Sequence, residues 1–97
     1  MIDPSVLERE MGCTRAEFMR WLPDATRRAP VQVEGDVLVL SVAGGQVRIL
    51  LRERPLRRIA LIALPVLAVT FRFEGLAAEA RRDFLARFDR YTMRGGG

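Results

Sequence analysis

The chain of 97 residues carries a net charge of +4, and its apolar fraction of 49% predicts one folded domain over residues 1–97. All 16 basic residues are arginine and no histidine is present, which excludes Schiff-base lysines, Walker-type phosphate loops and Ser-His or Cys-His nucleophiles. The single cysteine, Cys13, allows no intramolecular disulfide and no cysteine-based metal site. We therefore expect that the protein is not an enzyme and has no catalytic residue, no metal-binding residue and no cofactor.

The first segment has the signals of a short helix. Asp3 suits the N-cap, Pro4 the first helical position and Gly12 the C-terminal end. Together with the segment that follows, residues 7–22 resemble the helix-turn-helix of DNA-binding regulators, with Gly12 at the turn. Glu8 stands where that motif has a small residue, so we interpret the two helices as a helical hairpin that packs on a sheet.

A second short helix is predicted directly after the first. Thr14 and Glu17 have the spacing of a capping box, and Pro23 ends the helix near Leu22. A helix N-terminus lowers the pKa of a nearby thiol. No cationic partner or resolving cysteine accompanies Cys13, however, so we interpret it as an inert, half-buried thiol.

From Val31 onward the pattern changes to a period of two, which predicts strands. Residues 34–36 are one turn signal. Gly44-Gly45 is a second, because two adjacent glycines readily take the positive φ angles of a two-residue hairpin turn. Centring the second turn there gives three apolar cross-strand pairs on one face: Val42 with Val47, Leu40 with Ile49, and Leu38 with Leu51.

An apolar stretch lies between Pro55 and Pro65 and fits either a strand or a helix. Its length and its flanking prolines favour a central strand that is apolar on both faces. After Pro65 the alternation is regular and predicts a last strand. The side chains that this strand directs inward are Leu67, Val69, Phe71 and Phe73.

A long amphipathic helix is predicted from Leu76 to about Met93. Glycine after Arg94 suits a helix C-terminus, so we interpret residues 95–97 as a helix stop followed by a flexible tail. The tail also resembles the diglycine end of ubiquitin-like carriers, but there it follows a strand and here it follows a helix. The apolar stripe of the helix consists of Leu76, Ala80, Phe84, Phe88 and Tyr91.

These elements predict a two-layer α+β domain. It has two short N-terminal helices, an antiparallel meander sheet of four to five strands, and the long C-terminal amphipathic helix packed on one sheet face. Val37, Val39 and Leu50 then lie on the other face, where either the N-terminal helices or a second copy of the chain must cover them. We therefore predict that these three residues belong to an interface.

Five arginines cluster within residues 48–58, at a predicted strand end and in the loop after it. They are Arg48, Arg52, Arg54, Arg57 and Arg58. The cluster indicates either a phosphate-binding surface for RNA or DNA, or solvated charges that keep a sheet edge from aggregating. No aromatic residue interleaves with the arginines, which favours the second interpretation over binding of single-stranded nucleic acid.

These patterns do not determine a function. We expect a small non-enzymatic protein-binding or accessory domain that associates with itself or docks on a larger protein. The alternative is a basic nucleic-acid-binding module that uses residues 48–58. The longest apolar run, residues 59–71, is too short to span a bilayer and is broken by Pro65, so we expect a cytoplasmic protein with no membrane partner.

Overall fold

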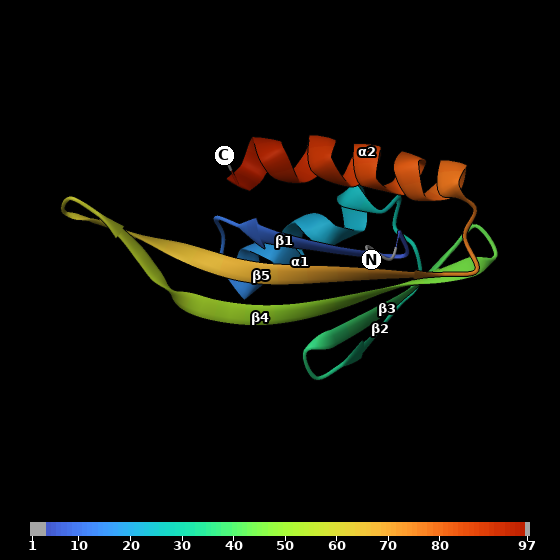
Figure 1. Cartoon of the computed structure of the whole chain (residues 1–97), viewed down its shortest axis with the longest axis horizontal. Coiled ribbons are helices and arrows are strands. Elements are labelled where there is room, and N and C mark those ends of the chain that lie inside the picture. The colour runs from blue at the N-terminus through green and yellow to red at the C-terminus, as the bar shows by residue number, and fades with distance from the viewer. Residues whose placement is uncertain (1–3, 97) are drawn as a thin grey trace.

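The computed structural model describes the backbone of residues 4–96 and the side chains of residues 4–92. Over this range the chain forms two helices and one five-stranded antiparallel sheet with the strand order β1-β5-β4-β3-β2 (Figure 1). The predicted α+β class and antiparallel sheet are confirmed. The elements are β1 (Val6–Met11), α1 (Arg15–Ala25), β2 (Val31–Glu34), β3 (Val37–Val42), β4 (Gly45–Ile59), β5 (Ile62–Glu74) and α2 (Ala78–Gly96).

The segment before Gly12 is a strand, so the prediction of two N-terminal helices is wrong. β1 pairs antiparallel with β5 along its whole length. Leu7 and Met11 pack against the core from one side of β1, and this period of two is that of a strand. Pairing with the edge of β5 outweighs the helix-start signals at Asp3 and Pro4. Asp3 itself lies outside the described residues.

The second predicted helix is α1, and its capping box is confirmed. The Glu17 amide donates to Thr14 Oγ1 at 3.1 Å, and the Thr14 amide donates to Glu17 Oε1 at 2.9 Å. α1 continues past Pro23, which was predicted to end it near Leu22. A proline in the last turn removes only one intrahelical bond. The helix instead ends where the Thr26 amide donates to the Leu22 carbonyl at 3.0 Å.

The hairpin between β3 and β4 turns at Ala43-Gly44, one residue earlier than predicted. Both turn residues have positive φ, 48° and 80°, as this kind of two-residue turn requires. The predicted register is therefore wrong by two positions, because Leu40 lies opposite Val47 and not opposite Ile49. A shift by an even number leaves each side chain on its predicted face.

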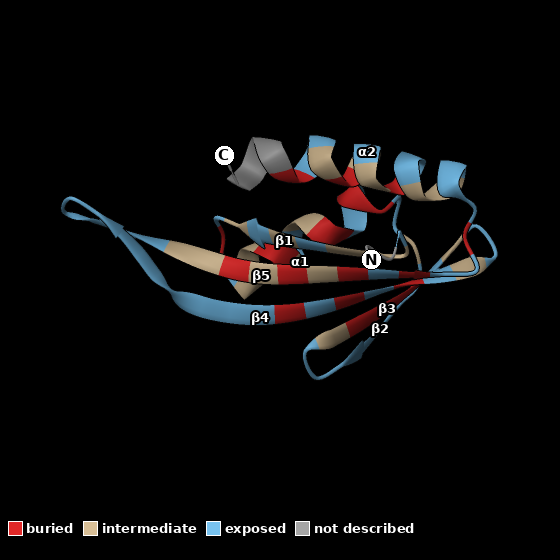
Figure 2. Cartoon of the chain, in the orientation of Figure 1, coloured by how far each residue is buried: buried red, intermediate tan, exposed pale blue. Residues whose placement is uncertain are grey.

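Residues 55–65 form neither a helix nor a central strand. β4 runs to Ile59, the chain turns at Ala60-Leu61, and β5 starts at Ile62, so the two strands form a hairpin that projects beyond the rest of the sheet (Figure 1). The predicted strand conformation is correct, but the tip of this hairpin is exposed (Figure 2). It is not central because β1 and β3 both end before they reach it.

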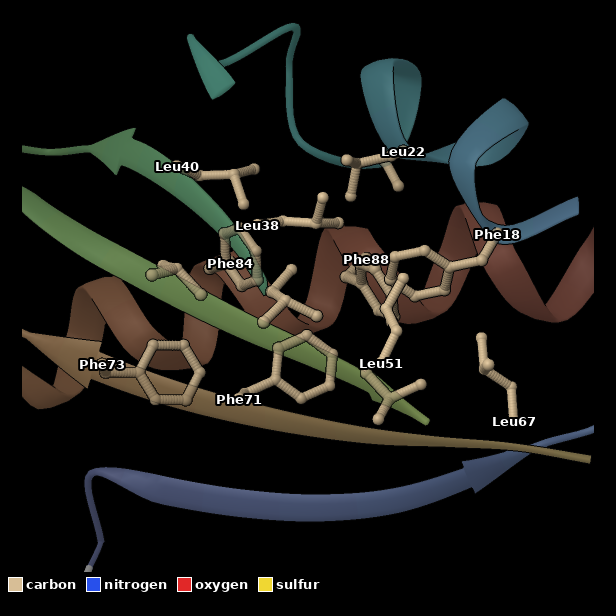
Figure 3. Packing of buried hydrophobic residues seen from close by; sticks show 14 of the residues in the cluster. Phe18, Leu22, Leu38, Leu40, Leu51, Leu67, Phe71, Phe73, Phe84 and Phe88 are labelled. Carbon is tan, nitrogen blue, oxygen red and sulfur yellow. The ribbon is translucent and has the colours of Figure 1, made fainter. Parts of the chain in front are cut away.

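Both helices pack on the same face of the sheet, and the core lies between the two layers (Figure 3). All five phenylalanines are buried there, and the ring of Phe88 joins the layers. Its centroid lies 5.0 Å from that of Phe71 in β5 and 5.7 Å from that of Phe18 in α1. The predicted inward row of β5, residues 67–73, is confirmed. The phenylalanines are Phe18, Phe71, Phe73, Phe84 and Phe88.

The predicted apolar stripe of α2 packs against the core except at Tyr91, which is 39% exposed. The guanidinium of Arg87 lies 4.5 Å from the centre of the Tyr91 ring. Thr92 is the buried residue of this turn. α2 extends to Gly96, past the end predicted near Met93, and Gly97 of the predicted tail lies outside the described residues.

Candidate binding face of the sheet

One face of the sheet is covered by neither helix of the described chain. Residues directly opposite each other in an antiparallel pair point to the same side, so the register assigns each strand residue to a side. Leu38, Ile49 and Phe71 mark the side under the helices. We call the other side the open face. Its residues are Val6, Glu8, Glu10, Gln32, Glu34, Val37, Val39, Ser41, Gln46, Arg48, Leu50, Arg52, Arg54, Arg57, Ile59, Ile62, Leu64, Val66, Ala68, Thr70, Arg72 and Glu74.

Four of the five predicted binding arginines form a row along β4 on the open face. They had been predicted at a strand end and in the loop after it, but all five lie within β4. Arg57 joins the row because a β-bulge after Arg54 adds one residue to β4 and reverses the alternation. A proline inside a strand is a signal of such a bulge, and Pro55 provides it. Arg58 lies on the other side of the hairpin. The arginine row is Arg48, Arg52, Arg54 and Arg57.

Glu8 and Glu10 of β1 form an acidic edge beside the arginine row. Glu10 lies opposite Ala68 of β5, which in turn lies opposite Arg52 of β4. Since one strand separates the two groups, they are about 10 Å apart. This edge was not predicted from the sequence, because the segment before Gly12 was predicted to be a helix. Residues 6–11 read Val-Leu-Glu-Arg-Glu-Met, in which charged and apolar residues do not alternate, so no period of two marked this strand.

Two ion pairs connect the arginine row with carboxylates. Arg48 Nε lies 3.0 Å from Glu74 Oε1, and Arg57 Nη2 lies 3.2 Å from Glu10 Oε1. All four side chains are about half exposed, so each pair contributes about 0–1 kcal/mol to stability. The pairs therefore do little to fix the fold, and a ligand can compete for them.

The centre of the open face carries uncompensated positive charge. Arg48 of β4 lies directly opposite Arg72 of β5, and like charges at such positions repel each other. Within residues 4–92, Arg52, Arg54 and Arg72 form no ion pair. A negatively charged group placed on this part of the sheet would meet arginines that are not already engaged.

The three predicted interface residues all lie on the open face. Leu50 is 40% exposed and Val37, directly opposite it, is half-buried. Val39 is only 8% exposed and lies opposite Arg48. Of these three residues Leu50 is therefore the main exposed apolar side chain, and Leu64 on the same face is 41% exposed.

A shallow hollow of about 460 Å³ lies between the acidic edge and the arginine row. The hollow exists because β5 contributes short side chains there, Ala68 and Thr70, whereas the strands on either side contribute long charged ones. Opposite charges thus face each other across a neutral floor. The lining residues are Glu8, Arg9, Glu10, Leu50, Arg52, Arg54, Ala68 and Thr70.

Groups with covalent or metal chemistry do not gather on this face. Cys13 is 1% exposed and lies in the core, where burial raises the pKa of its thiol to about 11. It is therefore a neutral thiol at pH 7, without the lowered pKa that a helix N-terminus can give. Across the described residues, no cluster of three or more His, Cys, Asp and Glu side chains is placed to hold a metal ion.

No protein-family model, curated protein or solved structure matches this chain. Neither helix of the described range is long and apolar enough to cross a membrane. The cytoplasmic location stays a prediction. The open face and its charges are thus the basis for a proposal on function.

Proposed function

We propose that this chain is a small non-enzymatic protein-binding domain that associates with a second copy of itself through the open face. One observation carries the proposal: an acidic edge lies about 10 Å from an arginine row, with short neutral side chains between them. A surface of this kind is complementary to its own copy in one orientation.

That orientation has its twofold axis along β5, midway between two stacked sheets. Rotation about this axis places β1 of one copy over β4 of the other. Glu10 then faces Arg52 of the second copy, and Ala68 faces its own copy on the axis. Stacked sheets lie about 10 Å apart, a gap that a glutamate and an arginine can close together. A twofold contact is reciprocal, so this pair forms twice.

The twofold axis perpendicular to the strands gives the opposite result. It stacks each strand on its own copy, so the arginine row faces an arginine row and the acidic edge faces an acidic edge. Like charges that face each other across an interface raise the free energy of the complex by several kcal/mol. Electrostatics therefore favours the axis along β5, with Leu50 inside the contact and Val37 at its margin.

Charge reversal tests this arrangement. Glu10→Arg and Arg52→Glu should each place like charges across the contact and weaken the dimer about tenfold or more. The double variant exchanges the two charges and should recover the affinity of the original chain. Sedimentation velocity over a range of protein concentrations measures the dimer affinity.

The matched control reverses two exposed charges on the outer side of α2, Glu79→Arg and Arg82→Glu, and should leave the dimer unchanged. A chain that stays monomeric at all concentrations contradicts the proposal, as does a double variant that fails to recover. A dimer strengthened by Arg52→Glu alone would contradict the axis along β5.

The second candidate function is a nucleic-acid-binding module. The arginines without ion-pair partners favour it, since phosphates would satisfy them. Against it, all five phenylalanines lie in the core, so no phenylalanine ring on the open face offers a stacking platform for bases.

Binding to duplex DNA and to single-stranded RNA at increasing salt concentration tests the second candidate. If phosphates bind the arginine cluster, replacing Arg54, Arg57 and Arg58 with Gln should flatten the dependence of affinity on salt. Replacing three exposed helix arginines removes the same charge elsewhere and should leave the dependence of affinity on salt unchanged. No binding at low salt would eliminate this function. The control residues are Arg20, Arg82 and Arg90.

A further inference from the structure

Residues 54–66 form an arm that projects beyond the sheet (Figure 1). The last pair between β1 and β5 involves Leu67, and the last pair between β3 and β4 involves Leu50, so neither neighbouring strand reaches the arm. The arm forms one end of the 46 Å long axis of the molecule. A two-stranded hairpin is marginally stable in water by itself, so an uncovered arm is a candidate for contact with a partner.

Apolar side chains surround the tip of the arm. Ile59 and Ile62 lie opposite each other on one side and are 55% and 60% exposed. Leu61 lies in the turn at the end and is fully exposed, and Ala63 is exposed on the other side. A flat protein surface can cover only one side of such a hairpin. A fluid environment into which the tip inserts can cover all of its sides.

Two arginines lie directly behind this tip, and one of them, Arg57, forms an exposed ion pair with Glu10 of β1. Arg57 and Arg58 precede Ile59, and at about 3.3 Å per residue they lie about 7 and 3 Å behind it along the strand. No Asp or Glu occurs in residues 54–73. Within residues 4–92, Arg58 forms no ion pair. The arm therefore combines an apolar tip with a positively charged collar.

We propose that the arm inserts its tip into the surface of an anionic lipid bilayer. Interfacial anchors bury apolar side chains about 5–10 Å deep while arginines remain at the headgroups. The arm has these dimensions: Ile59, Leu61 and Ile62 enter the acyl boundary, and Arg57 and Arg58 reach the lipid phosphates. The negative surface potential of anionic lipid attracts the arginines and adds to the apolar contribution.

A surface anchor differs from a membrane span, for which the apolar run of residues 59–71 is too short. Spanning needs about 20 apolar residues in a helix, whereas an anchor needs only a few exposed apolar side chains. The prolines of the arm, Pro55 and Pro65, lack amide donors and so disfavour a protein partner that adds a strand to the hairpin. Lipid is thus the partner that the tip and its collar fit best.

Co-sedimentation of the full chain with vesicles tests the proposal. One set of vesicles is phosphatidylcholine, and the other is phosphatidylcholine with phosphatidylglycerol at about 3:1. We expect binding to the anionic vesicles to be about tenfold stronger than binding to the neutral ones. We also expect it to weaken as NaCl is raised towards about 0.5 M, because salt screens the arginines.

Two matched pairs of variants assign any binding to the arm. Ile62→Asp in the arm and Val33→Asp in β2 replace exposed β-branched residues, 60% and 54% exposed. Only Ile62→Asp should weaken vesicle binding, by about tenfold or more. Arg58→Gln and Arg82→Gln each remove an exposed arginine without an ion pair in the described chain. Only Arg58→Gln should weaken binding.

Leu61→Asp separates this proposal from the proposed dimer. Because Leu61 is fully exposed and lies in the turn, the variant should fold normally, keep the dimer mass and lose vesicle binding. The proposal is wrong if the original chain does not bind anionic vesicles, or if Ile62→Asp and Val33→Asp bind equally well. Loss of dimer mass in Leu61→Asp, with no vesicle binding by the original chain, would assign the arm to a second copy.

Discussion

Cys13 shows how its surroundings change the chemistry of a single residue. It lies between β1 and α1, next to the N-cap Thr14, but its side chain points into the core and is 1% exposed. Burial raises the pKa of the thiol from its ordinary value of 9.0 to about 11, and the negative charge of Glu17 contributes in the same direction. Desolvation therefore outweighs the helix N-terminus, which would lower the pKa.

This shift predicts a loss of stability in alkali. Between pH 9 and 11 the thiol of the unfolded chain releases its proton while the folded chain retains it, so the free energy of unfolding falls as pH rises. Urea unfolding at about pH 8 and about pH 10.5 measures the change, with Cys13→Ala as the reference that lacks the thiol. Equal losses in both proteins would contradict this role of Cys13.

The β3–β4 hairpin shows why an element can differ from its strongest local signal. Gly44-Gly45 suits a two-residue turn, yet the turn uses Ala43 with a φ of 48°. Gly45 is required elsewhere: a Cβ on it would lie 2.4 Å from the backbone oxygen of Glu74 and 2.7 Å from that of Gly75. The close approach of β4 to the end of β5 therefore requires glycine at position 45. The turn forms one residue earlier, at Ala43-Gly44.

Gly45→Ala should accordingly destabilise the fold by about 1–3 kcal/mol or more, because the atoms in its way are backbone atoms. Gly12→Ala is the matched control, since a Cβ there meets nothing within 4 Å, and it should change stability by less than about 0.5 kcal/mol. Urea unfolding measures both. Similar values for the two variants would show that the approach of Gly45 to β5 is not tight.

At the scale of the whole molecule, the helices of the described residues cover one face of the sheet and leave the other uncovered. The aromatic cluster holds α1, α2 and the sheet together, and Phe88 is its centre, with ring contacts to Phe18, Phe71 and Phe84. Phe18 and Leu22 of α1 and Phe84 and Phe88 of α2 are buried on that side. The open face consequently keeps its charged rows and its hollow accessible to a partner.

Phe88→Ala should lower the free energy of unfolding by about 3–5 kcal/mol, because it leaves a cavity where α1, α2 and the sheet meet. Tyr91→Ala, on the same helix, removes an exposed ring and its contact with Arg87, and should cost about 1 kcal/mol or less. Chemical denaturation compares the two. A small effect of Phe88→Ala would mean that α2 contributes little to the core.

Local periodicity in the sequence determined much of this fold. The period of two in residues 67–74, the capping box at Thr14 and the apolar stripe of α2 all predicted correct elements, because each pattern reflects which side of one element is buried. The arginine cluster was found for a similar reason, since charge is a property of the residues themselves. Its arrangement as a row on one face was not found, because the bulge at Pro55 depends on pairing with β5.

Only the tertiary structure decided which distant segments pair and which faces stay uncovered. Residues 6–11 follow helix-start signals at Asp3 and Pro4, but they form a strand because the edge of β5 is available to them. That pairing alone places Glu8 and Glu10 beside the arginine row. Similarly, residues 55–65 are apolar enough for a core strand, yet they form an exposed arm because neither neighbouring strand is long enough to cover them. Pairing between distant strands depends on the lengths and edges of both partners, and no single segment contains that information.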